Sequence, residues 1–216
     1  IAGYIEWQAS AGMTCSFEDF TLGVIPLGSG NDWIKTLGVP KDLEKAVDVI
    51  VAGRVSKQDV VRVSMLDFDS LPAEREISVS YMANVGGVGL DAKVCEKVNA
   101  KKKQGKRGKI LYVTSLLNAI AGRKPVSLNI VCDGNPVFDG PYLSVAFGVG
   151  KYSGGGMRQT PAAVLDDGLL DMTVIPDLPM RRIACEAPRL FTGSFLKVPE
   201  LIVSKSRKIL VVPADM

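Results

Sequence analysis

The chain has 216 residues, 47% of them hydrophobic and 23% charged, which is typical of a globular protein with a core of its own. A formal net charge of +3 is too small to indicate nucleic-acid binding, and no apolar run approaches the length of a membrane span. The absence of histidine excludes every catalytic or metal site that depends on an imidazole, and four widely spaced cysteines favour the reduced thiols of a cytoplasmic protein.

The N-terminal residues give little indication of structure beyond a short strand at residues 1–5. The chain begins with isoleucine and ends directly after a strand-like run. We therefore expect the sequence to be part of a longer protein.

Residues 20–38 (FTLGVIPLGSGNDWIKTLG) predict a strand, a glycine turn and the start of a helix. Residues 22–27 form the apolar run of a buried strand, and Asn31 and Asp32 offer side chains that could cap the helix that follows. This order would direct free backbone N–H groups at one point, as in a phosphate site. A plain turn with a helix cap is the alternative, because the segment matches neither of the common glycine-rich nucleotide motifs.

Residues 42–52 predict an amphipathic helix with Leu43, Ala46, Val47, Ile50 and Val51 on its apolar stripe, and Gly53 at its end. We read residues 1–58 as a partial α/β nucleotide-binding domain. Residues 59–216 are predicted to form a second domain of mainly antiparallel strands, with helices near 90–122 and 180–192. The strands are expected at 59–65, 76–84, 126–132, 142–149, 169–175, 201–203 and 208–212, with hairpin turns at 133–135 and 167–168.

Two further segments permit a functional and a plain interpretation. Residues 86–91 (GGVGLD) formally resemble a dinucleotide fingerprint, but no acidic residue follows at the required distance, and we expect a close-packed turn or a substrate contact. Residues 101–109 (KKKQGKRGK) carry a dense basic cluster ahead of an apolar helix at 110–121. A solvated loop with a core helix is one interpretation, and a surface that approaches anionic lipids is the other.

Three carboxylates surround a glycine turn in residues 161–171 (PAAVLDDGLLD), namely Asp166, Asp167 and Asp171. A hairpin turn needs only one of these acids. Oxygen-only coordination of a hard cation such as Mg²⁺ or Ca²⁺ is the alternative.

Residues 26–32 (PLGSGND) closely resemble the P-x-G-[ST]-x-N-D segment of the diacylglycerol kinase-like lipid kinases, which include sphingosine and ceramide kinases. Residues 154–171, with GGGM followed by P-x-A-x-L-D-D-G-L-L-D, are similar to a second signature of that family. The resemblance implies a two-domain lipid kinase, with an α/β nucleotide-binding domain followed by an antiparallel β-sandwich-like domain.

The same resemblance implies a set of ligands and residues. ATP would bind at Gly28, Ser29, Gly30, Asn31 and Asp32, and a structural Mg²⁺ would be held by the Asp167 side chain and the carbonyls of Val164 and Leu169. The γ-phosphoryl group would pass to a hydroxyl of diacylglycerol or a related lipid, at the periphery of the membrane. A role in phospholipid metabolism follows. The formation of a homodimer is left as a possibility.

The GGDGT loop and the D-G-E segment of that family are absent from this sequence, so no catalytic base is assigned. Two alternatives remain. One is an NAD kinase-like enzyme acting on a soluble nucleotide, and the other is an inactive relative that binds lipid or a partner.

Overall fold

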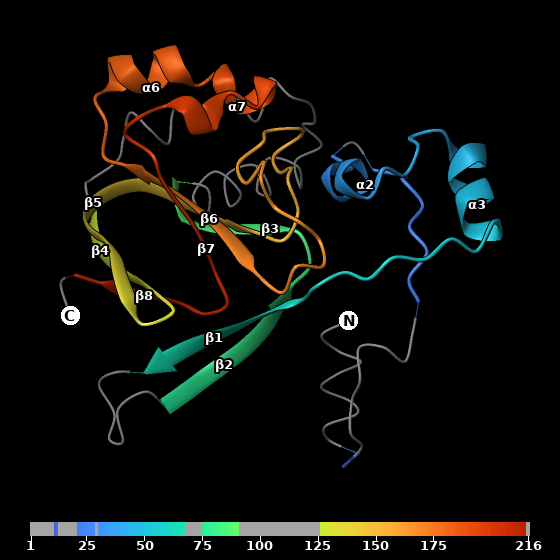
Figure 1. Cartoon of the computed structure of the whole chain (residues 1–216), viewed down its shortest axis with the longest axis horizontal. Coiled ribbons are helices and arrows are strands. Elements are labelled where there is room, and N and C mark those ends of the chain that lie inside the picture. The colour runs from blue at the N-terminus through green and yellow to red at the C-terminus, as the bar shows by residue number, and fades with distance from the viewer. Residues whose placement is uncertain (1–10, 13–20, 29, 68–74, 91–125, 215–216) are drawn as a thin grey trace, which may run out of the picture.

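A computed structural model describes residues 11–12, 21–28, 30–67, 75–90 and 126–214. The chain forms two parts that lie side by side (Figure 1). Residues 21–52 carry two helices and are called the α region here. Residues 61–213 carry all the described strands and are called the β region. The segments expected at 1–5, 101–109 and 110–121, together with Ser29, lie outside the described residues.

The α region contains α2 (Asp32–Leu37) and α3 (Leu43–Val51). The strand expected at residues 22–27 is wrong: the segment forms no strand, and Leu22, Ile25 and Leu27 are exposed. A strand requires a hydrogen-bonded neighbour, and none of the described strands pairs with this segment. An apolar run by itself therefore did not identify a strand.

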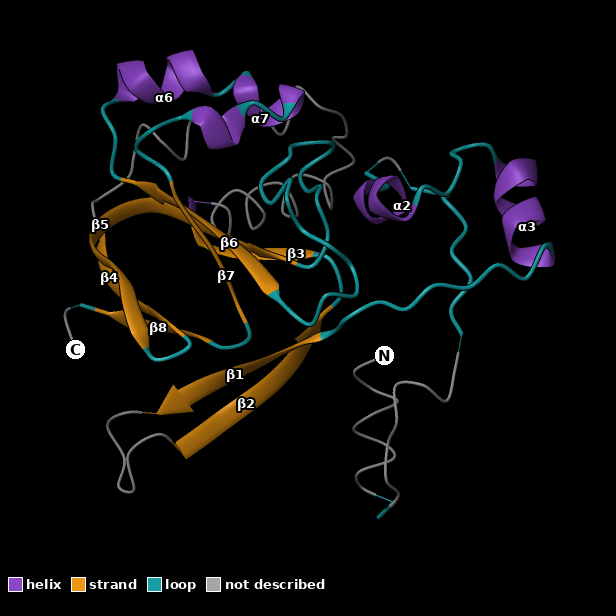
Figure 2. Cartoon of the chain, viewed as in Figure 1, coloured by secondary structure: helices purple, strands orange, loops and turns teal. Residues whose placement is uncertain are grey.

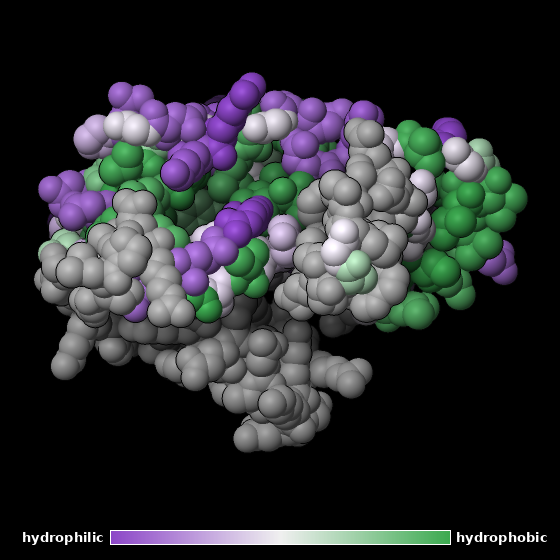
Figure 3. Space-filling model, turned by 90° about the horizontal axis from the view of Figure 1, so that it is seen from below, coloured by the Kyte–Doolittle hydropathy of each residue, from purple (hydrophilic) through white to green (hydrophobic). Residues whose placement is uncertain are grey.

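Helix α3 follows its sequence pattern closely. The Asp42 side chain accepts a hydrogen bond from the Lys45 amide at 3.0 Å, and Gly53 follows in a left-handed conformation with φ of 61°. Ala46 is fully buried, whereas the rest of the apolar stripe is exposed, as the green surface at the α3 end of Figure 3 shows. The helix is amphipathic as predicted, but most of its apolar face is open to solvent.

Strands β1 (Val61–Asp67) and β2 (Arg75–Met82) form a separate two-stranded antiparallel sheet (Figure 2). Val61 pairs with Met82, and the register slips by one residue between Met65 and Leu66. Exposed Val63, Met65 and Ile77 show that much of this hairpin is not covered by the rest of the described chain.

The remaining strands form one six-stranded antiparallel sheet. Its members are β3 (Val85–Gly89), β4 (Val126–Cys132), β5 (Asn135–Gly148), β6 (Leu170–Pro176), β7 (Ile202–Ser206) and β8 (Ile209–Pro213). The order is β7-β6-β5-β4-β8, with β3 pairing to the last residues of β5. The predicted strands in this part of the chain are therefore confirmed, and β4 has the predicted bounds.

Strand β5 organises the sheet because β3, β4 and β6 all pair with it. Asp133 and Gly134 join β4 to β5 with φ angles of 49° and 84°, the positive values of a tight hairpin turn. The core lies on the sheet and consists of Leu128, Ile130, Cys132, Val145, Met172 and Val174. Leu128, Ile130 and Cys132 occupy every second position of β4, which explains the period-2 pattern of that strand.

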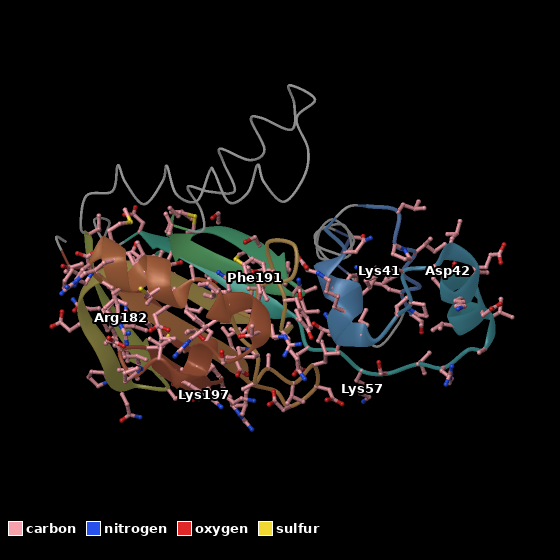
Figure 4. All side chains as sticks on the ribbon, turned by 90° about the horizontal axis from the view of Figure 1, so that it is seen from above. Lys41, Asp42, Lys57, Arg182, Phe191 and Lys197 are labelled. Carbon is pink, nitrogen blue, oxygen red and sulfur yellow. The ribbon has the colours of Figure 1, made fainter. Side chains whose placement is uncertain are left out.

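Helices α6 (Met180–Glu186) and α7 (Arg189–Thr192) lie above the sheet in Figure 1, and a short 3₁₀ helix, η2 (Phe195–Lys197), follows them. Arg182 holds this layer together by pairing with Glu186 at 2.6 Å and Glu200 at 2.8 Å. Figure 4 shows Arg182, Phe191 and Lys197 on this layer, apart from Lys41 and Lys57 near the α region.

Candidate functional site

The two motifs that stood out in the sequence meet at one place in the structure. Residues 151–158, called the triple-glycine loop here, follow β5 and lie against α2. Helix α2 in turn begins directly after Gly30 and Asn31, which together with Gly28 are called the Gly28 turn. We refer to the contact between α2 and the triple-glycine loop as the seam.

Asp32 makes the main polar contact across the seam. Its Oδ2 accepts a hydrogen bond from the Gly155 amide at 2.6 Å, and its Oδ1 pairs with Lys35 at 2.5 Å. Gly155 has a φ of 88°, a left-handed conformation that favours glycine. A carboxylate on the α region thus binds a backbone donor on the β region.

Further hydrogen bonds support this joint. The Lys151 amide donates to Thr36 Oγ1 at 3.1 Å. The indole of Trp33 donates to Gln58 Oε1 at 2.7 Å, and Gln58 passes the connection on to the carbonyl of Ala83 at 2.6 Å. Ile34 is the buried residue of α2. The helix is therefore held by these polar contacts and by one apolar side chain.

The Gly28 turn differs in detail from its predicted form. Asn31 adopts a left-handed conformation with φ of 49°, and its Nδ2 donates to the Gly28 carbonyl at 2.5 Å. Neither Asn31 nor Asp32 caps α2 with its side chain, so the predicted capping role is wrong for both. The side chains instead close the turn and bind the triple-glycine loop.

Asn84 fixes the other end of the triple-glycine loop. Its carbonyl accepts hydrogen bonds from Val149 and Gly150 at 3.0 and 3.1 Å, and its Nδ2 donates to the Tyr152 carbonyl at 3.0 Å. A side chain on Gly150 would overlap Asn84 Oδ1. The glycine is therefore needed for the close approach of the two backbones.

The segment after Asn84 was expected to join a strand to a helix and is instead strand β3, antiparallel to β5. The strand holds Gly86, Gly87 and Gly89, and a Cβ on Gly89 would lie 2.5 Å from the Tyr142 ring. The expected close packing is thus confirmed at Gly89, but it occurs in a strand, and the expected turn is wrong.

The turn of residues 164–169 carries the second group of polar residues. Asp167 Oδ1 accepts from the Leu169 amide at 3.1 Å, and Oδ2 pairs with the ammonium group of Lys205 at 3.0 Å. Lys205 also lies 3.2 Å from Asp171 Oδ2, although that contact lacks the geometry of a hydrogen bond. Asp171 is 2% exposed, so this buried carboxylate oxygen depends on the nearby ammonium charge of Lys205.

The pKa values of these groups follow from their surroundings. The hydrogen bond from Lys205 lowers the pKa of Asp167, and burial raises the pKa of Asp171 above its ordinary value. Burial alone would lower the pKa of Lys205, but the two carboxylates outweigh it and raise that pKa. The ammonium group therefore supplies the positive charge that this pair of carboxylates requires.

Asp59 ties the same turn to the start of the β1–β2 hairpin. Its Oδ2 accepts from the Gly168 amide at 2.7 Å, and its own amide donates to the Leu165 carbonyl at 2.6 Å. No set of three acidic, histidine or cysteine side chains gathers around one point in the described part of the chain. A metal at this turn would therefore need backbone carbonyls beside the Asp167 carboxylate, which is the oxygen-only type of donor set that a hard cation accepts.

Comparison with known proteins identifies the class. The model of the YegS C-terminal NAD kinase beta sandwich-like domain matches residues 84–216, and that of the diacylglycerol kinase catalytic domain matches residues 3–63. Since the first covers more than half of the chain, the chain belongs to the YegS and diacylglycerol kinase-like family of lipid kinases. The resemblance seen in the sequence is thereby confirmed.

Individual relatives agree with this family. A diacylglycerol kinase of Mycobacterium tuberculosis (strain CDC 1551 / Oshkosh) is 26% identical over 192 residues, which cover 88% of this chain and 59% of that protein. A "Probable lipid kinase YegS-like" of Xanthomonas campestris pv. campestris (strain 8004) is 27% identical, over 87% of this chain and 56% of its own length. The chain thus spans less than two thirds of the curated relatives it matches.

Solved structures show the same fold. A diacylglycerol kinase structure from Bacillus anthracis str. Sterne superimposes with a TM-score of 0.58 at 25% identity, covering 90% of this chain and 58% of that one. Another structure from the same organism gives a TM-score of 0.63 at 23% identity. The expected fold, an α/β part followed by an antiparallel β part, is confirmed, whereas the boundary at residues 58 and 59 stays a prediction.

Sequence reasoning missed two residues. Asp59 was interpreted only as the first residue of a strand, and Lys205 was not considered. Asp32 was included in the predicted nucleotide site, but its contact with the triple-glycine loop was not predicted. A single signal was present, since Asp59 and Lys205 are charged residues beside or within apolar strands. Their partners lie far away in the sequence, and no local pattern names them.

Proposed function

We propose that the intact protein is an ATP-dependent lipid kinase that transfers the γ-phosphoryl group of ATP to a hydroxyl of diacylglycerol or a related lipid. The observation that carries the proposal is the hydrogen bond from the Gly155 amide to Asp32, which joins the two signature segments at one seam. Phosphoryl transfer depends mainly on positioning the two substrates and neutralising phosphate charge. A seam between a glycine turn and a second polar loop suits that requirement.

On the nucleotide side, we assign the backbone of Gly28, Ser29 and Gly30, with Asn31, to phosphate binding. Asn31 keeps the turn closed through its bond to the Gly28 carbonyl. Asp32 stays in the nucleotide-side set, and its role is to position the turn, because both of its oxygens are engaged by protein groups.

For the metal, we propose that Mg²⁺ binds at the turn before β6, with Asp167 as the side-chain ligand and the carbonyls of Val164 and Leu169 as the others. Asp166 would lie next to these ligands without binding the ion directly. When bound, the ion would supply positive charge to the buried Asp171 and would fix the turn against Asp59. Its role is structural, and Lys205 would have to yield part of its contact to Asp167.

The test of the activity is direct. The intact protein is incubated with labelled ATP and, in separate samples, with diacylglycerol, sphingosine or ceramide in mixed micelles, or with NAD⁺ in solution. Label in a phosphorylated lipid supports the proposal. Label in NADP⁺ alone would replace it with NAD kinase activity, and no transfer at all would leave an inactive relative that binds lipid or a partner.

A point variant tests the nucleotide site. Ser29→Ala removes a hydroxyl from the Gly28 turn and should weaken ATP binding by roughly tenfold without lowering the melting temperature. Unchanged affinity in calorimetry would mean that the segment is only a turn. Membrane association remains part of the same proposal. As a separate finding, no described helix has both the length and the apolar character needed to cross a bilayer.

A further inference from the structure

Arg158, at the end of the triple-glycine loop, has no carboxylate partner among the described residues. Arg182, which is also partly buried, is neutralised by its pairs with Glu186 and Glu200. Arg158 is partly buried, and a partly buried guanidinium without a counter-ion is unfavourable. Such a group is well suited to receive an anion.

The position of Arg158 is defined by a ring contact, a backbone hydrogen bond and a neighbouring glycine. Its Cζ lies 5.4 Å from the centre of the Tyr152 ring, and its backbone amide donates to the Leu190 carbonyl at 2.6 Å. Gly193 has a φ of 79°, and a Cβ there would lie 2.6 Å from Arg158 Nη1. An aromatic face and a glycine thus keep room for a planar guanidinium.

The surroundings of this guanidinium combine charge with apolar surface. The Nζ atom of Lys35 lies 5.8 Å from the centre of the same Tyr152 ring, but Lys35 is already paired with Asp32. On the other side of Arg158, Leu190 is followed by Phe191, whose side chain is 49% exposed on α7. Arg158 is therefore connected through Tyr152 to the polar seam and through Leu190 to the sequence neighbour of an exposed aromatic residue.

We propose that Arg158 binds the phosphate monoester of the phosphorylated lipid, with its two terminal N–H groups on two phosphate oxygens and Phe191 beside the apolar part of the molecule. The planar fork of arginine matches the geometry of a phosphate. The proposal rests on the lipid kinase function proposed above, and it names the residue that recognises the product on the lipid side of the seam.

The experiment compares binding to vesicles of phosphatidylcholine that contain either phosphatidic acid or phosphatidylglycerol. Both additives are anionic, but only phosphatidic acid carries a phosphate monoester. The variants are Arg158→Lys, which keeps the charge and loses the fork, and Arg158→Ala, tested with and without added guanidinium ion. Arg181→Lys is the matched control, because Arg181 is an exposed arginine on α6 away from the seam.

Wild-type protein should prefer phosphatidic acid vesicles. Arg158→Lys should bind them roughly tenfold more weakly, with unchanged affinity for phosphatidylglycerol vesicles and for ATP. Guanidinium ion should restore part of the lost binding to Arg158→Ala. The Arg181→Lys variant should match the wild type in each arm.

The proposal would be overturned by unchanged phosphatidic acid binding by Arg158→Lys, by an equal loss for both anionic lipids, or by a loss confined to ATP. A purely structural role for Arg158 would lower the melting temperature and leave lipid selectivity intact, which also overturns it. The proposed kinase function is decided separately, by transfer from labelled ATP in the wild type. Product recognition can thus fail while transfer succeeds, and transfer can fail while selective binding persists.

Discussion

Gly150 is a residue whose identity is dictated by one contact. It lies directly before the triple-glycine loop, and any side chain there would overlap Asn84 Oδ1. We expect Gly150→Ala to reduce the free energy of unfolding by about 2–3 kcal/mol, because the backbone or Asn84 must shift. Denaturant unfolding measures the change.

The matched control for Gly150→Ala is Gly30→Ala. No atom lies within 4 Å of the position where a Cβ on Gly30 would stand. The unfolding free energy of Gly30→Ala should therefore stay near that of the wild type. Equal losses in both variants would show that the overlap with Asn84 is not the cause.

Glu200 gives a prediction about pH. The hydrogen bond from Arg182 lowers the pKa of this carboxyl in the folded protein. Because the folded-state pKa lies below the unfolded one, the contribution is present above the unfolded pKa and is lost as the pH falls through the folded pKa. Glu200→Gln should therefore flatten the fall of the melting temperature below about pH 5.

The control for this prediction is a double-mutant cycle with Arg182→Met. If the pair is responsible, the double variant should show no further flattening of the acid limb beyond that of the single variants. Additive effects of the two substitutions would contradict the assignment of the pH dependence to this pair.

Some residue roles could be predicted from the sequence and others could not. The positive φ angles of Asp133 and Gly134 follow from the Asp-Gly hairpin signal, and the cap formed by Asp42 follows from its position before an apolar stripe. The contact between Asp32 and Gly155 joins residues 123 positions apart. A pattern confined to a few neighbouring residues contains no information about such a partner.

At the scale of single elements, α2 depends on the seam. It has only six residues, too few for a stable isolated helix, and its one buried side chain is Ile34. Asp32→Ala removes a charge-assisted hydrogen bond and should reduce stability by about 2 kcal/mol. Hydrogen exchange should become faster in α2 and in the triple-glycine loop, while the six-stranded sheet keeps its protection.

Asp48→Asn is a suitable control for Asp32→Ala, because it alters an exposed carboxylate on α3. It should leave the exchange of α2 and of the loop unchanged. If Asp32→Ala also leaves the loop's exchange unchanged, the seam does not depend on this hydrogen bond.

The strands were predictable where their residues alternate and less so where they do not. Residues 126–132 have a clear period of two, and β4 has these bounds. The start of β5 was missed because Pro136, Gly140 and Pro141 read as chain breaks, yet β5 runs through all three as one 14-residue strand. Register shifts beside this stretch accommodate the irregular residues.

At the scale of the whole molecule, the turn before β6 connects the two sheets. Asp59 links it to the start of the hairpin, and Lys205 links it to β7. If Mg²⁺ binds there as proposed, it should raise the melting temperature of the wild type by about 2–4 °C for each kcal/mol of binding free energy. Scanning calorimetry with and without Mg²⁺ measures this.

Two variants separate the roles at this turn. Asp167→Ala should abolish the Mg²⁺-dependent shift, because it removes the proposed side-chain ligand. Lys205→Met should enlarge the shift, since it removes the ammonium group that competes for Asp167 and Asp171. The same Mg²⁺-dependent shift in wild type and Asp167→Ala would end the metal assignment.

Because β5 is the hydrogen-bonded neighbour of three other strands, it also dictates the order in which the chain can assemble. The β4–β5 hairpin closes through two turn residues and can form early, since little chain entropy is lost. Strand β3 reaches β5 only across a long intervening segment, so we expect it to dock late. The contacts of Asn84 with Val149, Gly150 and Tyr152 would then be among the last to form during refolding.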